Sequence, residues 1–288
     1  MMFEKPVIAL LYDFDKTLCT KDMQEYSFIP EVKMESTAFW QESNSLAKKH
    51  KMDRILASMY LMLQKAKEAQ EPVCRDNFVT FGNALQFFPG VEDWFARIDQ
   101  LGETLQMTIE HYIISSGLRE IIEGSSIYPH FREVFASEYY YDENGDACWP
   151  KNMVNYTIKT QFLYRVNKGV LDISNDDDLN RYIADEERAV PFRNMIYIGD
   201  GLTDVPCMHL VKENGGYSIA VYQSGRREAV EELLKHERVD FLVLADYSEH
   251  GELDEIVQDM IHTMAMVEGL KRKNQEQLVQ IRSIPGEE

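Results

Sequence analysis

Four aspartates stand directly after apolar runs of the sequence. The stretch VIALLYDFDKTL ends its apolar run with Asp13 and Asp15, and IGDGLTD ends another with Asp200 and Asp204. Carboxylates that lie close together in a dry site cannot all ionise cheaply unless a cation lies near them. Oxygen ligands of this kind suit Mg²⁺, a hard divalent ion. These residues therefore predict a magnesium site.

The apolar runs before these aspartates are predicted strands of a parallel sheet. Short runs rich in β-branched and aromatic residues, bounded by polar or turn residues, indicate buried strands. Six such runs are found at residues 7–12, 111–115, 133–137, 195–200, 218–222 and 241–245. Continuous apolar runs suit parallel strands that are covered on both faces. Since parallel strands end at one edge of a sheet, the four aspartates can converge there.

Helical stretches between these runs complete the pattern. They are expected at residues 91–101, 119–123, 158–165 and 226–235. Alternation of strand and helix from residue 106 onward is typical of an α/β fold with a doubly wound, Rossmann-like parallel sheet. Asn144-Gly145, between apolar runs, predicts a hairpin. Three aspartates at 176–178 lack the glycine and distal glutamate of an EF-hand, so they predict a solvated loop.

One long interval contains no expected strand. It runs from about residue 19 to residue 89, and within it the stretch 37–69 carries apolar side chains at helical spacing. We therefore predict a core of residues 1–18 and 106–288 and an inserted helical cap of residues 19–105. Such an insert can lie over the carboxyl ends of the strands, where open α/β sheets bind ligands.

Composition excludes several classes of protein. The formal net charge of −19 argues against a nucleic-acid partner, which would need a basic footprint. The first apolar run is six residues long, too short for a signal peptide or a membrane span. The four cysteines have no spacing typical of zinc sites or of a disulfide framework. We expect a cytoplasmic protein without a membrane or nucleic-acid partner, and an anionic substrate would need a local cation.

Further polar residues complete an ordered set of motifs. After Asp13 and Asp15 comes the helical insert, then HYIISSGLRE with Ser115 at the end of a predicted strand, then an isolated Lys159, then GDGLTD. In this order the chain resembles the haloacid dehalogenase superfamily of phosphohydrolases. The DxDxT motif of that family is matched from Asp13 to Thr17. Its GDxxxD motif is matched from Gly199 to Asp204, and its Ser and Lys motifs by Ser115 and Lys159.

The resemblance covers residues 7 to about 222 and implies roles for the matched positions. It implies a C1-type cap similar to that of the phosphoserine phosphatase branch. Asp13 would be the nucleophile and Asp15 the general acid and base. Ser115 and Lys159 would bind the phosphoryl group. The contacts implied for the substrate are Thr17, Ser116 and Gly117, with the backbone of the last two opening a helix.

The same resemblance implies the ligands of the metal. Mg²⁺ would be held by the Asp13 carboxylate, the Asp15 backbone carbonyl and Asp200. Asp204 would bind a coordinated water or orient Lys159. Lys168 is a rival for the role of Lys159.

The expected function is Mg²⁺-dependent hydrolysis of a small-molecule phosphate monoester through an aspartyl phosphate. A non-catalytic phosphate-binding or regulatory protein and a phosphomutase are alternatives on the same fold. The substrate stays open, because Asp22, Glu25 and Arg54 are only loose counterparts of the residues that bind phosphoserine. Aromatic residues in the cap would suit a larger or less polar leaving group, and Lys16 could contact a substrate anion or project into solvent.

Overall fold

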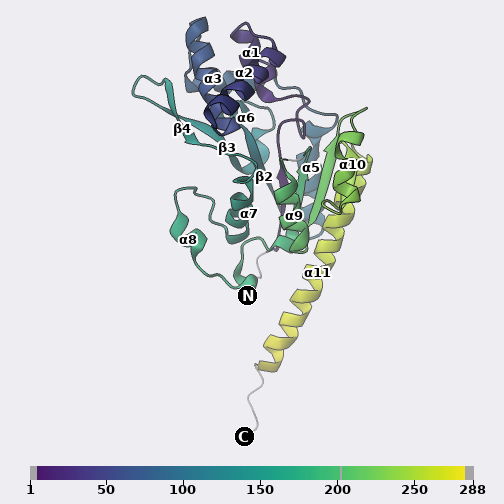
Figure 1. Ribbon diagram of the computed structural model, residues 1–288. Helices are drawn as coiled ribbons and strands as arrows, with labels where there is room; N and C mark the ends of the chain where they lie inside the picture. Colours follow the sequence, from purple (N-terminus) through teal and green to yellow (C-terminus); the bar gives the residue numbers. More distant parts are fainter. Residues whose placement is uncertain (1–4, 202, 283–288) are drawn as a thin grey trace.

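The computed structural model describes residues 5–201 and 203–282 as a sheet of seven strands with helices on both faces (Figure 1). The strands are β1 (Val7–Tyr12), β2 (Thr108–Leu118), β3 (Phe131–Tyr141), β4 (Ala147–Asn152), β5 (Met195–Gly199), β6 (Tyr217–Tyr222) and β7 (Phe241–Leu244). Their order is β4-β3-β2-β1-β5-β6-β7, and only the β3–β4 pair is antiparallel. The chain winds outward from β1 in both directions, so the predicted doubly wound α/β fold is confirmed.

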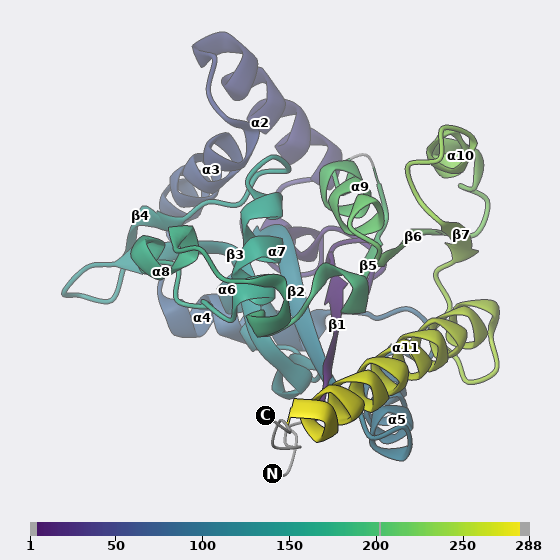
Figure 2. The same cartoon turned by 90° about the horizontal axis from the view of Figure 1, so that it is seen from below.

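Two layers of helices cover the sheet. One face carries α5 (Val91–Thr104) and α11 (Glu252–Arg282), and the other carries α7 (Lys159–Lys168), α9 (Val205–Glu213) and α10 (Glu228–Lys235) (Figure 2). Side chains of a strand point alternately to its two faces. In β1, Leu10 and Tyr12 therefore pack with the first layer, while Ala9 and Leu11 pack with the second. Burial on both faces explains the continuous apolar run of β1.

The interval without an expected strand forms the helices at the upper end of Figure 1. These are α1 (Phe28–Glu31), α2 (Ser36–His50), α3 (Arg54–Ala69) and α4 (Arg75–Phe81), with short 3-10 turns at Met23–Glu25 and Gly82–Ala84. Phe28 and Phe39 are buried in contact with other rings of this insert. These two aromatic side chains therefore belong to the core of the insert, whereas Tyr60 is exposed.

The division into core and cap stays a prediction. Within the predicted cap, α5 packs against β2 and α11, and its Trp94 and Phe95 are fully buried. This packing favours a cap that ends before Val91, because α5 covers one face of the sheet.

The remaining elements refine the sequence prediction. They are α6 (Arg119–Glu123), α8 (Asp176–Asn180) and 3-10 turns at Tyr128–His130, Asp185–Glu187 and Phe192–Asn194. The Asn144-Gly145 turn joins β3 and β4 as a hairpin, with Gly145 at φ 83°. The 176–178 aspartates begin the exposed helix α8 rather than a loop, because Asn175 caps the amide of Asp178. In the described part of the chain, no helix has both the length and the apolar character of a membrane span.

Candidate active site

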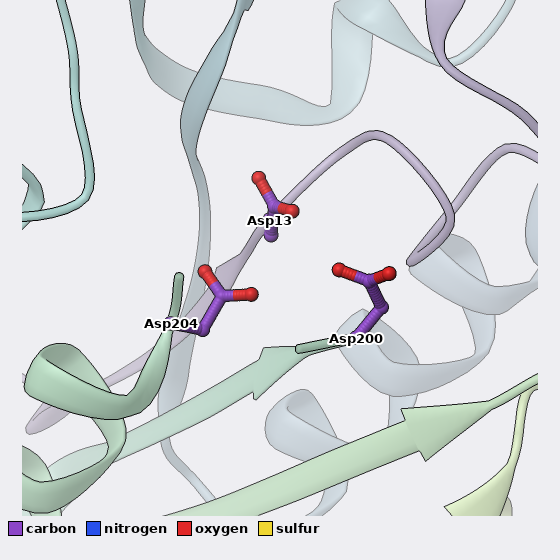
Figure 3. Close-up of side chains that lie close together, drawn as sticks. All are labelled: Asp13, Asp200 and Asp204. Carbon is purple, nitrogen blue, oxygen red and sulfur yellow. The ribbon is translucent and has the colours of Figure 1, made fainter. Parts of the chain in front are cut away.

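Three carboxylates meet at the carboxyl edge of the sheet. Asp13 follows β1, Asp200 follows β5, and Asp204 precedes α9; one oxygen of each lies within 4.8 Å of the others. Figure 3 shows these three side chains pointing toward a common space. The approach is a consequence of topology, because β1 and β5 are parallel neighbours and Asp13 N–H donates to the carbonyl of Ile198 at 2.9 Å.

Lys159 joins two of these carboxylates. Its Nζ donates to Asp13 Oδ1 at 2.8 Å and to Asp204 Oδ1 at 2.7 Å, and the residue is 1% exposed. The Tyr197 hydroxyl donates to the same Asp204 oxygen at 2.8 Å. Sequence reasoning missed Tyr197, which reads as an ordinary strand residue. Asp204 therefore contacts Lys159 directly, and its expected role in orienting Lys159 or binding a coordinated water stays a prediction.

Lys168, the rival lysine, lies elsewhere. Its Nζ donates to the backbone carbonyls of Leu179 and Arg181, and it does not line the cavity beside Asp13. The structure thus brings Lys159, and not Lys168, to the aspartates.

Among the described residues, the buried carboxylates at this edge outnumber the buried cations. Burial raises the pKa of Asp13 to about 6, with Lys159 opposing and Asp204 adding to the shift. Burial, reinforced by repulsion from Asp13 and Asp204, raises the pKa of Asp200 to about 8. Burial also disfavours the charge on Lys159, but the attraction of Asp13 and Asp204 is stronger, and its pKa rises. One buried cation therefore faces three carboxylates.

A divalent cation fits this donor set. Among the described residues, the Asp200 carboxylate has neither a hydrogen bond nor an ion pair, and Asp204 Oδ2 is buried without a hydrogen-bond partner. All the candidate ligand atoms are oxygens, which Mg²⁺ prefers.

Asp15 is held apart from the three grouped carboxylates. Its Oδ1 accepts the Met23 N–H at 2.8 Å and contacts the Cys19 thiol. Burial, with repulsion from Asp22 and Asp13, raises the pKa of Asp15 well above its usual value. A raised pKa suits a carboxyl group to donate a proton to a leaving group.

Ser115, which matches the Ser motif of the family, lies in the irregular end of β2. The register against β3 shifts between Ile114 and Leu118, so the residues between them bulge out of the ladder. Ser115 is 1% exposed, and its Oγ accepts the Gly117 N–H at 3.0 Å. Ser115 and Ser116 line the cavity beside Asp13. The expectation that Ser116 and Gly117 open a helix is wrong, because the strand continues to Leu118 and the helix begins at Arg119.

Thr17 and Gly117 lie outside this cavity. Thr17 is fully buried, its Oγ1 has no hydrogen-bond partner among the described residues, and its carbonyl accepts the Tyr247 hydroxyl at 2.9 Å. Gly117 lines an adjoining hollow of about 220 Å³ together with Asp15 and Trp40. The substrate contacts suggested for Thr17 and Gly117 stay predictions.

The cavity has a volume of about 590 Å³ and is walled by both the sheet and the insert. Residues contributed by the insert are Asp22, Met52, Asp53, Arg54 and Ile55. Lys16, at φ 60°, points into the same space and forms an ion pair with Asp22 at 2.6 Å. The insert therefore closes over the carboxyl edge of the sheet.

The three loose candidates for leaving-group recognition differ in what they contact. Asp22 is occupied by Lys16, and Glu25 accepts the Trp40 indole N–H at 2.9 Å. Arg54 is exposed at the cavity and forms no ion pair with a described residue. Arg54 is thus the candidate whose charge is left for a ligand.

Sequence reasoning also missed a contact across the cavity. Asn155, in the loop before α7, donates through Nδ2 to Asp53 Oδ2 at 2.9 Å. A helix-start signal was available at Asp53, which caps α3. Its partner 102 positions away could not be read from a local pattern.

Comparisons with known proteins agree with this geometry. A family model described as haloacid dehalogenase-like hydrolase matches residues 10–209. An uncharacterised protein of Borreliella burgdorferi is 29% identical in an alignment 282 positions long, which covers 88% of this chain and 96% of that protein.

Solved structures share the fold at low sequence identity. A haloacid dehalogenase family hydrolase from Salmonella enterica serovar Typhi has a TM-score of 0.55 at 16% identity, covering 88% of this chain and 71% of that one. A phosphoserine phosphatase carrying a phospho-aspartyl intermediate analogue has a TM-score of 0.52 at 14% identity, covering 88% and 99%. Because the family model matches most of this chain, the chain belongs to the haloacid dehalogenase superfamily of hydrolases.

Proposed function

We propose that this hydrolase is a Mg²⁺-dependent phosphatase that cleaves a small-molecule phosphate monoester through an aspartyl phosphate on Asp13. The observation that carries the proposal is the contact of Lys159 with Asp13 and Asp204, beside Asp200, in a cavity that also holds Asp15. Phosphoryl transfer asks a protein mainly for positioning and charge neutralisation. This group of residues supplies both.

In the first step an Asp13 carboxylate oxygen attacks phosphorus. An oxygen–phosphorus bond forms, and the bond between phosphorus and the ester oxygen breaks. Asp15 gives its proton to that leaving oxygen, so the alcohol departs neutral. The raised pKa of Asp15 supports this role.

In the second step Asp15, now ionised, takes a proton from water. The water oxygen attacks phosphorus, and the bond to Asp13 breaks, which regenerates the carboxylate and releases inorganic phosphate. Lys159 offers its charge to the phosphoryl oxygens while it holds Asp13 in place. Ser115 adds a hydroxyl donor from the bulged end of β2.

Mg²⁺ would be held by Asp13, Asp200 and the backbone carbonyl of Asp15, and Asp204 would act through Lys159. When bound, the ion would supply positive charge to the transferring phosphoryl group. The Asp200 carboxylate, which has no hydrogen bond among the described residues, supports this assignment. A cytoplasmic location and the absence of nucleic-acid and membrane partners stay predictions from the sequence.

The test is turnover of p-nitrophenyl phosphate by the purified chain with and without MgCl₂. We expect release of phosphate that needs Mg²⁺ and falls at least about a thousandfold in Asp13→Asn, as for removal of other catalytic nucleophiles. Asp259→Asn, an exposed site on α11, is the matched control and should keep full activity. Lack of turnover across a broad panel of phosphate esters would refute the phosphatase proposal, and an active Asp13→Asn would refute the nucleophile.

A further inference from the structure

We propose that Asn155 is a positioning residue that couples the helical insert to Lys159 through its hydrogen bond to Asp53. The kinetic consequence rests on the phosphatase function proposed above, whereas the structural coupling can be measured without it. Both residues line the cavity that holds Asp13, and neither belongs to the matched motifs.

On the core side, Asn155 fixes the turn that leads into α7. Its Oδ1 accepts the Thr157 N–H at 3.1 Å, the Thr157 hydroxyl at 2.8 Å and the Ile158 N–H at 3.0 Å. Its backbone carbonyl accepts the Lys159 N–H at 3.1 Å. These bonds satisfy amides that a helix start leaves without partners. The backbone of Lys159 is thereby fixed relative to Asn155.

On the insert side, Asp53 does the same for α3. Its Oδ1 accepts the N–H groups of Ile55 at 2.8 Å and Leu56 at 3.2 Å. Its second oxygen, Oδ2, accepts the amide of Asn155 at 2.9 Å. Asp53 thus caps α3 with Oδ1, and Asn155 holds the turn before α7 with its own Oδ1, while the remaining polar atoms of the two side chains join each other.

The position of the Asp53–Asn155 bond would allow it to affect the position of Lys159. The insert is also tied to the core at the β3–β4 side, where the buried Tyr139 hydroxyl donates to the Met59 carbonyl at 2.7 Å. The Asp53–Asn155 bond lies instead at the cavity, where the first turn of α3 faces the first turn of α7. A shift of α3 there would pull on the loop that sets the position of Lys159. The carboxylate of Asp53 makes this a charge-assisted hydrogen bond, which is stronger than a bond between neutral groups and can hold the two segments together.

Exchange of the two residues separates coupling from capping. Asn155→Asp keeps an oxygen that can accept from Thr157 and Ile158 in the turn before α7, but it places two carboxylates next to each other. Asp53→Asn keeps the cap of α3 through Oδ1, but it places the new NH₂ group against the NH₂ group of Asn155, so that two donors face each other. The double variant Asp53→Asn with Asn155→Asp restores one hydrogen bond in the reverse direction and leaves the net charge unchanged. Asn175→Asp is the control, since Asn175 also caps a helix and donates to a carboxylate, Asp178, away from the cavity.

We expect kcat for p-nitrophenyl phosphate with Mg²⁺ to fall about tenfold or more in each single variant, because a lost charged hydrogen bond corresponds to at least one such factor. The double variant should recover most of that loss. KM should change less than kcat, since the phosphoryl-binding groups remain present. The Asn175→Asp control should match the unchanged protein.

Hydrogen exchange gives a readout that does not need activity. Asp53→Asn should speed exchange in the segment 155–162, across the cavity from the substitution, and Asn155→Asp should speed it in 53–59; the double variant should slow both again. Single variants with unchanged exchange across the cavity, or a double variant no better than the singles, would overturn the coupling. If no phosphate ester is turned over, the phosphatase proposal fails while the exchange data still decide the coupling.

Discussion

The ammonium group of Lys159 lies 2.8 Å from the nucleophile candidate Asp13, although 146 positions separate the two residues. Asp204 accepts from the same nitrogen at 2.7 Å. Both bonds are buried, where an unpaired charge is expensive. Lys159 therefore serves two purposes, since it keeps Asp13 aimed into the cavity and offsets part of the acidic charge there.

Replacement of Lys159 by methionine should damage both stability and turnover. It leaves two buried carboxylates without their cation, which typically costs about 3–5 kcal/mol in the free energy of unfolding. Loss of one transition-state donor should lower kcat by about 100- to 1000-fold. Urea unfolding and p-nitrophenyl phosphate kinetics measure the two effects.

Lys168→Met is the matched control for this replacement. Among the described residues, the Lys168 ammonium group donates to the backbone carbonyls of Leu179 and Arg181, so kcat should be unchanged. Equal losses in both variants would contradict the assignment of Lys159.

Asp15→Asn should separate the two halves of the proposed reaction. An amide cannot take a proton from water, so the phosphorylated form of Asp13 should accumulate when the leaving group is as good as nitrophenolate. Intact-protein mass spectrometry after incubation with p-nitrophenyl phosphate and MgCl₂ should show one added phosphoryl group. The added group should be absent in the double variant with Asp13→Asn. A single variant that turns over at the unchanged rate would remove Asp15 from the mechanism.

The sequence was sufficient for the aspartates but not for their partners. Asp13 and Asp200 could be placed because each ends a continuous apolar run, and parallel strands bring such ends to one edge. Lys159 was placed by its order in the motifs, and only the fold separates it from Lys168. The Asp53–Asn155 bond had no signal, because it depends on how two elements 102 positions apart pack together. The Tyr197 contact had none, because it depends on where the start of α9 places Asp204 relative to β5.

The irregular backbone at the end of β2 could not be predicted from the sequence either. The bulge between Ile114 and Leu118 arises from the register of β2 against β3, which a sequence of one strand does not contain. The strand was therefore predicted to end at residue 115, before its observed end at Leu118, whereas the helix expected at residues 119–123 is found there as α6.

Removal of the charge at Asp200 should stabilise the metal-free protein and abolish its response to Mg²⁺. The ordinary pKa of this carboxyl is 3.8, and the folded value is about 8. Between these values the unfolded chain releases a proton that the folded chain keeps, so stability falls as pH rises through this window. Asp200→Asn should therefore show a higher melting temperature than the unchanged protein at pH 8 with EDTA.

With MgCl₂ added, the unchanged protein should have the higher melting temperature of the two. A ligand at 100 times its Kd stabilises the folded state by about 2.7 kcal/mol, which the unchanged protein should gain and Asp200→Asn should not. Thermal unfolding in EDTA and in MgCl₂ measures both. An equal rise in melting temperature for the two proteins would place the cation elsewhere.

His111 should make the protein less stable in mild acid. His111 belongs to a chain of hydrogen bonds. Its Nδ1 lies 2.9 Å from the buried Tyr12 hydroxyl, which also accepts the Trp94 indole N–H at 2.9 Å. Its Nε2 lies 3.2 Å from an Asp99 carboxylate oxygen. Burial lowers the pKa of His111 below 6.5, although Asp99 opposes the shift. As pH falls below 6.5, the unfolded chain binds a proton that the folded chain refuses, so the free energy of unfolding falls until the folded pKa is reached.

His111→Gln should flatten this dependence, whatever its effect on stability at pH 7.5. Urea unfolding at half-unit steps from pH 5 to pH 7.5 measures the slope for each protein. His209→Gln, at an exposed position on α9, is the control and should keep the slope of the unchanged chain. A slope that survives in His111→Gln would assign the acid sensitivity to other groups, because a titrating residue cannot contribute after its removal.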